Sequence, residues 1–196
     1  DITMGKNQRE GALGAARDQA MEEVSAAMAA EGEAPAVAAL LFALDVVEGG
    51  VIRKGIKSGT RCDGRGLNDV RPLFAEVGLL PIVHGSSLFN RGDTQALATV
   101  TVGSLDDRQK LDSLVGPRTK RLMLHYAFPP YSVNECGKVG GASRREIGHG
   151  ALAEKALAGV LPPESIFPFS VRINSDTMGS NGSSSMAAVC SGSLAL

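Results

Sequence analysis

Apolar residues in the first quarter of the chain recur with the period of a helix. Between residues 36 and 47 they are separated by steps of three and four positions: Val37, Leu40, Leu41, Leu44 and Val47. This spacing predicts a helix with one buried face. The alanine-rich stretch 15–30 predicts a preceding helix, and Pro35 stands where the start of a helix tolerates a proline. We therefore expect a helical hairpin within residues 1–50.

From residue 61 onward the pattern is that of short strands and glycine turns. Two β-rich runs, 86–89 and 94–102, flank Asn90-Arg91-Gly92-Asp93, and together they predict a hairpin. A further strand is expected at 121–128. Alternation of Phe169, Val171 and Ile173 with polar neighbours predicts a half-buried strand at 167–175.

Two helices are expected among these strands. The segment 145–161 carries an apolar stripe made of Ile147, Leu152, Ala156 and Val160. A last helix should begin near 183–185 and run through residue 190. Strands and helices on a shared core are typical of α+β or α/β architecture. We assign the chain to the α+β class.

Charge divides the chain at the same place as the apolar pattern. Residues 1–50 hold nine Asp or Glu and three Lys or Arg, a balance of −6, whereas the whole chain carries −1. The remaining residues therefore carry +5, which directs any polyanionic partner to them. We predict a helical domain at 1–50, a linker at 51–60 that contains a basic stretch, and a second domain at 61–196.

Composition excludes several classes of protein. The longest uncharged apolar run, 36–44, has nine residues, far fewer than the roughly 20 of a membrane-spanning helix. The three cysteines are widely spaced and contain no CxxC pair, so neither a disulfide framework nor a structural zinc is expected, and a reducing compartment is favoured. The chain also lacks a P-loop, a GxSxG elbow, an HExxH helix and a GxGxxG loop. Acidic residues after position 60 are scattered, so we expect no metal ligands in this chain.

The segment Asn181-Gly182-Ser183-Ser184-Ser185-Met186 lies between an expected strand and an expected helix. Backbone N–H groups converge at such a helix start and favour an anion such as phosphate. In the simpler alternative, Ser183 or Ser184 caps the helix, which is the commoner use of serine at this position. Both interpretations stay open on spacing alone.

A second segment, Ser143-Arg144-Arg145-Glu146-Ile147-Gly148-His149-Gly150, places two arginines at a helix start. Arginine there opposes the helix dipole, and paired guanidinium groups can grip phosphodiester oxygens. The alternative is a solvated basic turn in which Glu146 pairs with one arginine. His149 could act as a proton donor or a ligand, and the alternative is a structural role. Arg91 could reach a ligand from the tip of its hairpin, and the alternative is an exposed turn residue.

Five motifs occur in order along the chain. They are Arg61-Cys62-Asp63-Gly64-Arg65, then His84-Gly85-Ser86-Ser87-Leu88-Phe89 with Arg91-Gly92-Asp93-Thr94-Gln95, then Phe128-Pro129-Pro130-Tyr131, the arginine segment and the serine segment. Together they closely resemble the polynucleotide phosphorylase family, specifically the second of its two ribonuclease-PH-like (split β-α-β) domains. The resemblance covers residues 61–196, which correspond to the N-terminal part of that second domain. Residues 1–60 resemble the preceding helical domain more loosely.

The resemblance implies a phosphate-dependent 3′→5′ exoribonuclease, a polyribonucleotide nucleotidyltransferase that releases nucleoside diphosphates and runs in reverse as an RNA polymerase. By motif position, Ser183, Ser184 and Ser185 would bind inorganic phosphate as co-substrate. Arg144 and Arg145 would hold the RNA 3′ end with His149 close by, and Arg91 would contact RNA.

The resemblance also implies a Mg²⁺ whose ligands lie outside this chain, and a homotrimer around single-stranded RNA. Arg61-Cys62-Asp63 and Asp107-Arg108-Gln109 resemble plant and algal organelle forms, so we expect a mitochondrial or chloroplast protein, otherwise a cytoplasmic one.

The alternative is a non-catalytic RNA-binding or assembly subunit derived from this family. We expect a fragment of a longer enzyme that is inactive alone. Gly179 and Ile82 depart from the family, which usually has Glu and often Arg at these positions, and the first could loosen the loop before the serines.

Overall fold

The structure is a computed structural model that describes residues 5–32 and 36–196. The chain divides into two compact units, residues 1–70 and 71–196, which are described separately. The division falls ten residues beyond the expected start of the second domain at residue 61. Pro35 lies outside the described residues.

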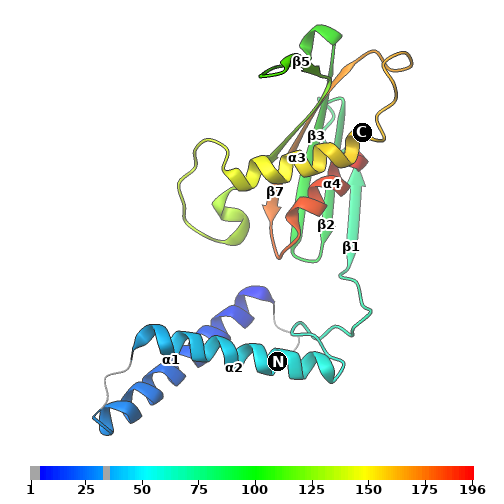
Figure 1. The fold of residues 1–196 in the computed structure, drawn as a ribbon. Coiled ribbons are helices and arrows are strands. Elements are labelled where there is room, and N and C mark those ends of the chain that lie inside the picture. The colour runs from blue at the N-terminus through cyan, green and yellow to red at the C-terminus, as the bar shows by residue number, and fades with distance from the viewer. Residues whose placement is uncertain (1–4, 33–35) are drawn as a thin grey trace. The chain divides into compact units, whose positions relative to one another are not determined.

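The first unit contains two helices, α1 (Lys6–Ala30) and α2 (Val37–Lys57) (Figure 1). Arg17 of α1 joins them, because its guanidinium donates to Asp45 Oδ1 at 2.6 Å and to Glu48 Oε2 at 2.5 Å, both on α2. The linker predicted at 51–60 is wrong for residues 51–57, which continue α2. Gly49 and Gly50 do not end the helix, since each glycine costs only about 1 kcal/mol relative to alanine and α2 has 21 residues.

The buried face predicted for 36–47 is also wrong. No residue of α2 is buried, and Val37, Leu41 and Val47 are 61%, 49% and 63% exposed. Of the five apolar residues in the predicted stripe, only Leu40 and Leu44 are half-buried. The physical reason is that a single alanine-rich partner helix offers too little side-chain surface to enclose an apolar stripe.

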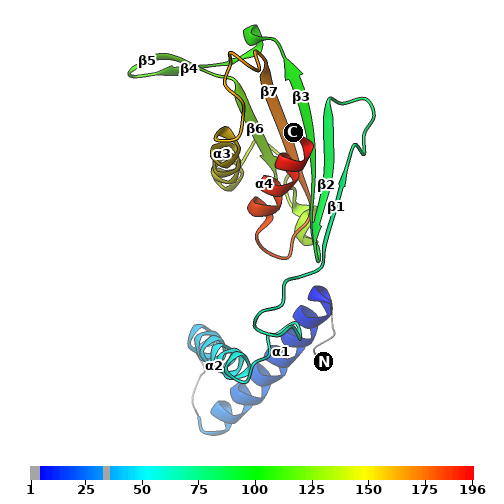
Figure 2. The same cartoon turned by 90° about the vertical axis from the view of Figure 1, so that its right-hand side faces the viewer.

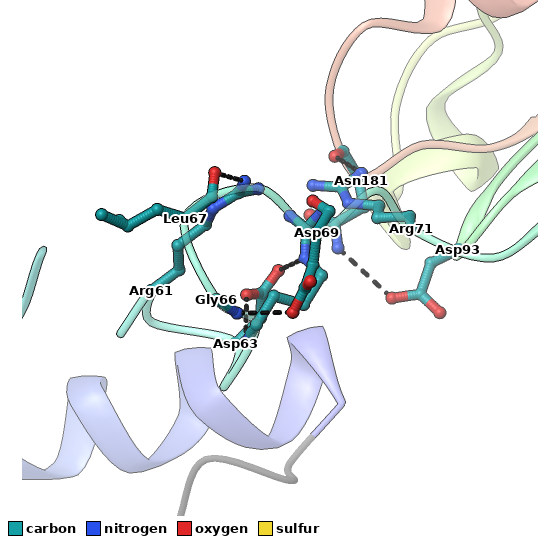
Figure 3. Close-up of polar contacts among 9 residues, drawn as sticks. Arg61, Asp63, Gly66, Leu67, Asp69, Arg71, Asp93 and Asn181 are labelled. Atoms are coloured by element: carbon teal, nitrogen blue, oxygen red, sulfur yellow. Dashed lines mark hydrogen bonds and ion pairs between the residues drawn. The ribbon is translucent and has the colours of Figure 1, made fainter. Parts of the chain in front are cut away.

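The first unit ends in a compact loop held by its own polar groups (Figure 3). Arg61 donates to Leu67 O at 2.5 Å, Arg65 Nε donates to Asp63 Oδ2 at 2.7 Å, and Gly66 N donates to an Asp69 carboxylate oxygen at 2.7 Å. The motif Arg61–Arg65 therefore shapes this loop.

The second unit is built on a five-stranded sheet in the order β1-β2-β3-β7-β6 (Figure 2). Its strands are β1 (Leu73–Val77), β2 (Gly85–Arg91), β3 (Thr94–Gly103), β6 (Leu122–Ala127) and β7 (Ser170–Gly179). All pairs are antiparallel except β6 with β7. The predicted hairpin around Gly92 and the strand at 121–128 are confirmed. A two-stranded hairpin, β4 (Gln109–Ser113) and β5 (Gly116–Lys120), was not predicted.

Helices α3 (Arg144–Ala158) and α4 (Ser184–Ala195) pack on one face of the sheet (Figure 2). Two short 3₁₀ helices, Leu105–Asp107 and Pro130–Val133, complete the unit. The α+β class is confirmed. The core between helices and sheet consists of Ala98, Val100, Leu122, Leu124, Tyr126, Ala153, Leu157, Val171, Ile173, Ala188 and Ala195. Among the described residues, no helix has the length and apolar character needed to cross a membrane.

The apolar stripe predicted for α3 is wrong. Ile147, Leu152 and Val160 are 62%, 47% and 67% exposed, while the buried residues of the helix are Gly150, Ala153 and Leu157. Two of these three buried residues are small because α3 runs close to β6, where a Cβ on Gly150 would lie 3.3 Å from Leu124 O.

The alternation predicted at 167–175 is partly confirmed. Val171 and Ile173 are buried in β7, but Phe169 precedes the strand and is 44% exposed. Ser170 is buried instead, at 2% exposed, and the strand extends to Gly179.

Candidate functional site

The serine motif forms the turn between β7 and α4. Gly182 and Ser183 both have left-handed backbone conformations, with φ of +86° and +52°. Ser183 occupies the N-cap position, yet its side chain makes no capping hydrogen bond. Ser183 is exposed, Ser185 is half-buried and Ser184 is only 2% exposed. The capping interpretation is therefore wrong for Ser183, whose side chain leaves the N–H groups of the first turn of α4 uncapped.

The tip of the β2–β3 hairpin holds this turn in place. Thr94 Oγ1 accepts from Asn181 N at 3.0 Å and donates to Gly182 O at 3.1 Å. Arg91 also donates to Gly182 O, at 3.0 Å. Arg91 thus supports the serine turn through the backbone, which neither sequence interpretation of Arg91 had included.

Two further side chains fix the turn from the same side (Figure 3). Arg71 donates to Asn181 O at 2.7 Å, and Asn181 Nδ2 donates to Asp93 Oδ2 at 3.3 Å. A Cβ on Gly179 would lie 3.0 Å from Asp93 O. Glycine therefore fits the close approach of β7 to the hairpin here, and the turn is held tightly without the glutamate that the family usually has.

The arginine motif begins α3, and this helix start is capped. Ser143 Oγ accepts from Glu146 N at 3.2 Å, and Glu146 Oε2 accepts from Ser143 N at 2.7 Å. Glu146 Oε1 also accepts from Phe128 N at 2.8 Å, at the end of β6. These hydrogen bonds from the Phe128 and Ser143 backbone lower the pKa of Glu146 below its ordinary value.

The carboxylate of Glu146 is thus committed to backbone N–H groups rather than to an arginine, so the predicted Glu146–arginine pair is not formed. Both arginines are exposed. The guanidinium of Arg145 lies over the Phe128 ring, 4.2 Å from its centroid, a cation–π contact that limits its orientation.

A second glutamate on α3 fastens the helix to the edge of the sheet. Glu154 Oε2 accepts from Leu124 N at 3.2 Å and from Lys120 Nζ at 2.8 Å. With Glu146, it satisfies N–H groups of an edge strand that would otherwise lack partners. This attachment fixes the position of α3, and with it that of the two arginines and His149.

Tyr126 on β6 contacts both motifs. Its hydroxyl donates to Ser184 Oγ at 2.7 Å, and its ring meets His149 edge-on with centroids 5.3 Å apart. It also stacks with Phe128 at 6.2 Å. The structure therefore brings the serine motif and the arginine motif together, with Tyr126 of β6 in contact with both. Sequence reasoning missed Tyr126, although its place at alternate positions with Leu122 and Leu124 in the predicted strand marked it as inward-facing.

The groups gathered here are hydrogen-bond donors and cations. They comprise two exposed guanidinium groups, the uncapped N–H groups of α4 and serine hydroxyls, which suits an anion such as phosphate. His149 adds an imidazole whose Nδ1 is buried and has no hydrogen-bond partner in the described part of the chain. Within residues 5–32 and 36–196 there is no group of three or more His, Cys, Asp or Glu residues that could hold a metal ion.

Comparison with known proteins decides the family. The family model for the 3′ exoribonuclease family, domain 1 (RNase PH), matches residues 69–196. The chain belongs to this family. The matched RNase PH segment contains both motifs and Tyr126.

Three similar relatives of the chain are polyribonucleotide nucleotidyltransferases. Polyribonucleotide nucleotidyltransferase 2, mitochondrial, of Oryza sativa subsp. japonica is 54% identical over 197 aligned positions, covering all of this chain and 20% of that protein. The protein of the same name from Arabidopsis thaliana is 52% identical with the same coverage. Polyribonucleotide nucleotidyltransferase of Nitratidesulfovibrio vulgaris is 61% identical over 146 positions, covering 74% of this chain and 19% of that protein. The chain thus spans about one fifth of the length of these relatives.

Solved structures share the fold of the RNase PH unit. The Archaeoglobus fulgidus exosome with RNA bound to the active site matches with a TM-score of 0.58 at 16% identity, over 74% of this chain and 58% of that chain. An archaeal exosome core matches with a TM-score of 0.55 at 14% identity, over 74% and 55%. At this identity the likeness establishes the fold, and the predicted ribonuclease-PH-like fold is confirmed.

Proposed function

We propose that this chain is part of a phosphorolytic 3′→5′ exoribonuclease, a polyribonucleotide nucleotidyltransferase. Inorganic phosphate attacks the phosphorus of the last phosphodiester of an RNA, and the bond from that phosphorus to the 3′ oxygen of the preceding nucleotide breaks. A nucleoside diphosphate leaves, and the RNA is shortened by one nucleotide. The reverse reaction extends RNA. The observation that carries this proposal is the uncapped start of α4 beside the exposed arginines of α3, joined through Tyr126.

The donors at the start of α4 suit the attacking phosphate. Its first-turn N–H groups, together with the exposed Ser183 and half-buried Ser185, would bind the phosphate oxygens. Ser184 contributes its N–H, and its hydroxyl anchors the helix start to Tyr126. Arg91 supports this site by holding the Gly182 carbonyl, in addition to any contact with RNA.

The arginines of α3 suit the RNA 3′ end. Arg144 and Arg145 would hold the phosphodiester next to the scissile bond and offset the negative charge that accumulates when phosphate attacks it. His149 lies one helical turn beyond them, and would supply a proton to the departing 3′ oxygen.

Magnesium is expected in the whole enzyme, where it would neutralise phosphate charge. The described residues do not fit such a site, because they contain no cluster of carboxylates or imidazoles. The guanidinium and backbone N–H groups of the two motifs do not ligate Mg²⁺, which is held by carboxylate and other oxygen ligands. We therefore expect its ligands to lie elsewhere in the full-length protein.

The proposal extends to partners and location. Single-stranded RNA is the substrate, the enzyme is a homotrimer, and residues 61–196 belong to the second of two RNase-PH-like domains, preceded by a helical domain. The names of the rice and Arabidopsis relatives place those proteins in mitochondria, which supports a mitochondrial location for this one.

The test uses the full-length protein and a 5′-labelled single-stranded RNA. Phosphate should produce stepwise shortening from the 3′ end together with nucleoside diphosphates, detected by anion-exchange chromatography, and omission of phosphate should stop both. RNA binding without phosphate-dependent release of nucleoside diphosphates would overturn the proposal and favour the non-catalytic subunit.

A further inference from the structure

Tyr126 is placed between the two halves of the proposed site. It is 6% exposed and lies on β6, a strand that neither motif belongs to. Its hydroxyl reaches α4 and its ring reaches α3. One side chain thereby contacts the helix start proposed for phosphate and the helix proposed for RNA.

The hydroxyl contact fixes the start of α4. The Tyr126 hydroxyl and Ser184 Oγ are 2.7 Å apart in a buried setting, where a missing partner is costly because water cannot replace it. Ser184 is the first residue of the helix. Its position therefore sets where the uncapped N–H groups and the hydroxyl of Ser185 point.

The ring contact fixes His149 and, through Phe128, Arg145. The His149 ring meets the Tyr126 ring at an interplanar angle of 72°, and Phe128 stacks on Tyr126 at 16°. Arg145 lies over that same Phe128. Edge-on and stacked aromatic contacts are directional, so the orientation of Tyr126 is passed on to both side chains of α3.

We propose that Tyr126 is a positioning residue that holds the phosphate half and the RNA half of the site in register, its hydroxyl acting on the phosphate half and its ring on the RNA half. This inference rests on the proposed function. Tyr126 contacts neither substrate, and it acts through Ser184, His149 and Phe128.

The first test is Tyr126→Phe in the full-length protein, which removes the hydroxyl and keeps the ring. The KM for phosphate should rise about tenfold, the loss expected when a buried hydroxyl loses its partner, while the KM for RNA stays within about twofold of wild type. Equal changes in both KM values, or in neither, would overturn the division of roles.

Tyr131→Phe is the matched control. Tyr131 is the other tyrosine of the chain, is 57% exposed, and its hydroxyl meets only Met178 Sδ at 3.9 Å in the described structure. The same chemical change there should leave both KM values unchanged.

A double-mutant cycle tests whether the hydroxyl acts through Ser184. Ser184→Ala should raise the phosphate KM as much as Tyr126→Phe does, and the double variant should be no worse than either single variant. If the rise in phosphate KM of the double variant equalled the product of the two single rises, the two hydroxyls would act independently and the proposal would be overturned.

Tyr126→Leu removes the ring as well and should add a rise of about fivefold or more in the KM for RNA, which Tyr126→Phe does not show. Thermal unfolding shows whether each variant is folded. If Tyr126→Leu does not fold, the Tyr126→Phe variant and the double-mutant cycle with Ser184→Ala decide whether Tyr126 positions the site.

Phosphate binding supplies a readout apart from turnover. Inorganic phosphate should raise the unfolding temperature of the wild-type protein, and Tyr126→Phe should require about tenfold more phosphate for the same rise. An inactive wild-type protein that is still stabilised by phosphate would contradict the proposed function alone. An active wild-type protein with an unchanged Tyr126→Phe variant would contradict the positioning role alone, and absence of both activity and stabilisation would overturn both.

Discussion

The starts of α3 and α4 are both preceded by serine, and they are built in opposite ways. At α3, Ser143 and Glu146 form a capping box that satisfies backbone N–H groups within the chain. At α4, Ser183 stands in the same position with a left-handed backbone and caps nothing. The capped start carries exposed arginines, whereas the uncapped start leaves N–H donors for another group.

The difference shows two ways in which one chain treats the N–H groups at a helix start. The capping box at the start of α3 engages two N–H groups, those of Ser143 and Glu146, so positive charge at that start comes mainly from the side chains of Arg144 and Arg145. An uncapped start supplies the donors itself and needs an external framework to hold it. Thr94, Arg91 and Tyr126 provide that framework.

The largest effect on the reaction rate is expected from a substitution at the capped start of α3. Arg145→Ala in the full-length enzyme should lower phosphorolysis about 100-fold, the order lost when one contact to a transition-state charge is removed. The rate of nucleoside diphosphate release measures it. Arg118→Ala, at an exposed arginine of β5, is the control and should retain the wild-type rate. Near-normal turnover of the Arg145 variant would remove that residue from the site.

A smaller effect is expected when the uncapped start is shifted. Gly182→Ala places a Cβ on a backbone with φ of +86°, a cost of about 1–2 kcal/mol that is relieved if the turn moves. The KM for phosphate should rise about tenfold. Gly78→Ala carries a similar strain at φ of +70°, with no atom within 4 Å of the new Cβ, and should leave that KM unchanged. An equal response of both variants would mean that the effect is general destabilisation.

The two serines themselves provide a direct comparison. Ser143→Ala removes a cap and should cost about 1 kcal/mol, which appears as roughly fivefold faster amide hydrogen exchange in the first turn of α3. Ser183→Ala removes no capping bond and should leave exchange in α4 unchanged in the absence of phosphate. Faster exchange in α4 for the Ser183 variant would show that its hydroxyl caps the helix in solution.

The smallest effect concerns pH. Because hydrogen bonds from the Phe128 and Ser143 backbone hold the pKa of Glu146 below its ordinary 4.5, ionised Glu146 stabilises the fold above that pH. The stabilisation is lost as the pH falls through the lowered folded value. Glu146→Gln should therefore unfold about 1–3 °C below wild type near neutral pH, with the difference shrinking in more acidic buffer. A constant difference across this range would show that charge on Glu146 is irrelevant.

Several elements were predictable from sequence because the signals are local. The β2–β3 hairpin follows from β-rich runs on both sides of Gly92, which adopts φ of +57°. The start of α4 near Ser183 and the strand that carries Tyr126 were likewise predicted within one or two residues. The grouping of the arginine and serine motifs as site candidates also came from residue types at helix starts, although their roles remain predictions.

Burial was less predictable than the elements themselves. The helical period of 36–47 was correct, but its face is not buried, since burial depends on what another element places against it. In α3 the large residues Ile147 and Leu152 face outward, and the helix comes so close to β6 at Gly150 that a larger residue would not fit there. A period identifies a face, and only packing determines which face is covered.

The sequence by itself determined the class of fold, the hairpin, and the two helix starts that carry the arginine and serine motifs. The tertiary structure decided that both motifs contact Tyr126, and that the N-cap serine caps α3 but not α4. Tyr126 and Ser184 are 58 residues apart in the chain, and Arg91 and Gly182 are 91 apart. A serine hydroxyl caps a helix only when the backbone places it over the N–H groups, and at Ser183 that backbone is set by contacts from distant strands.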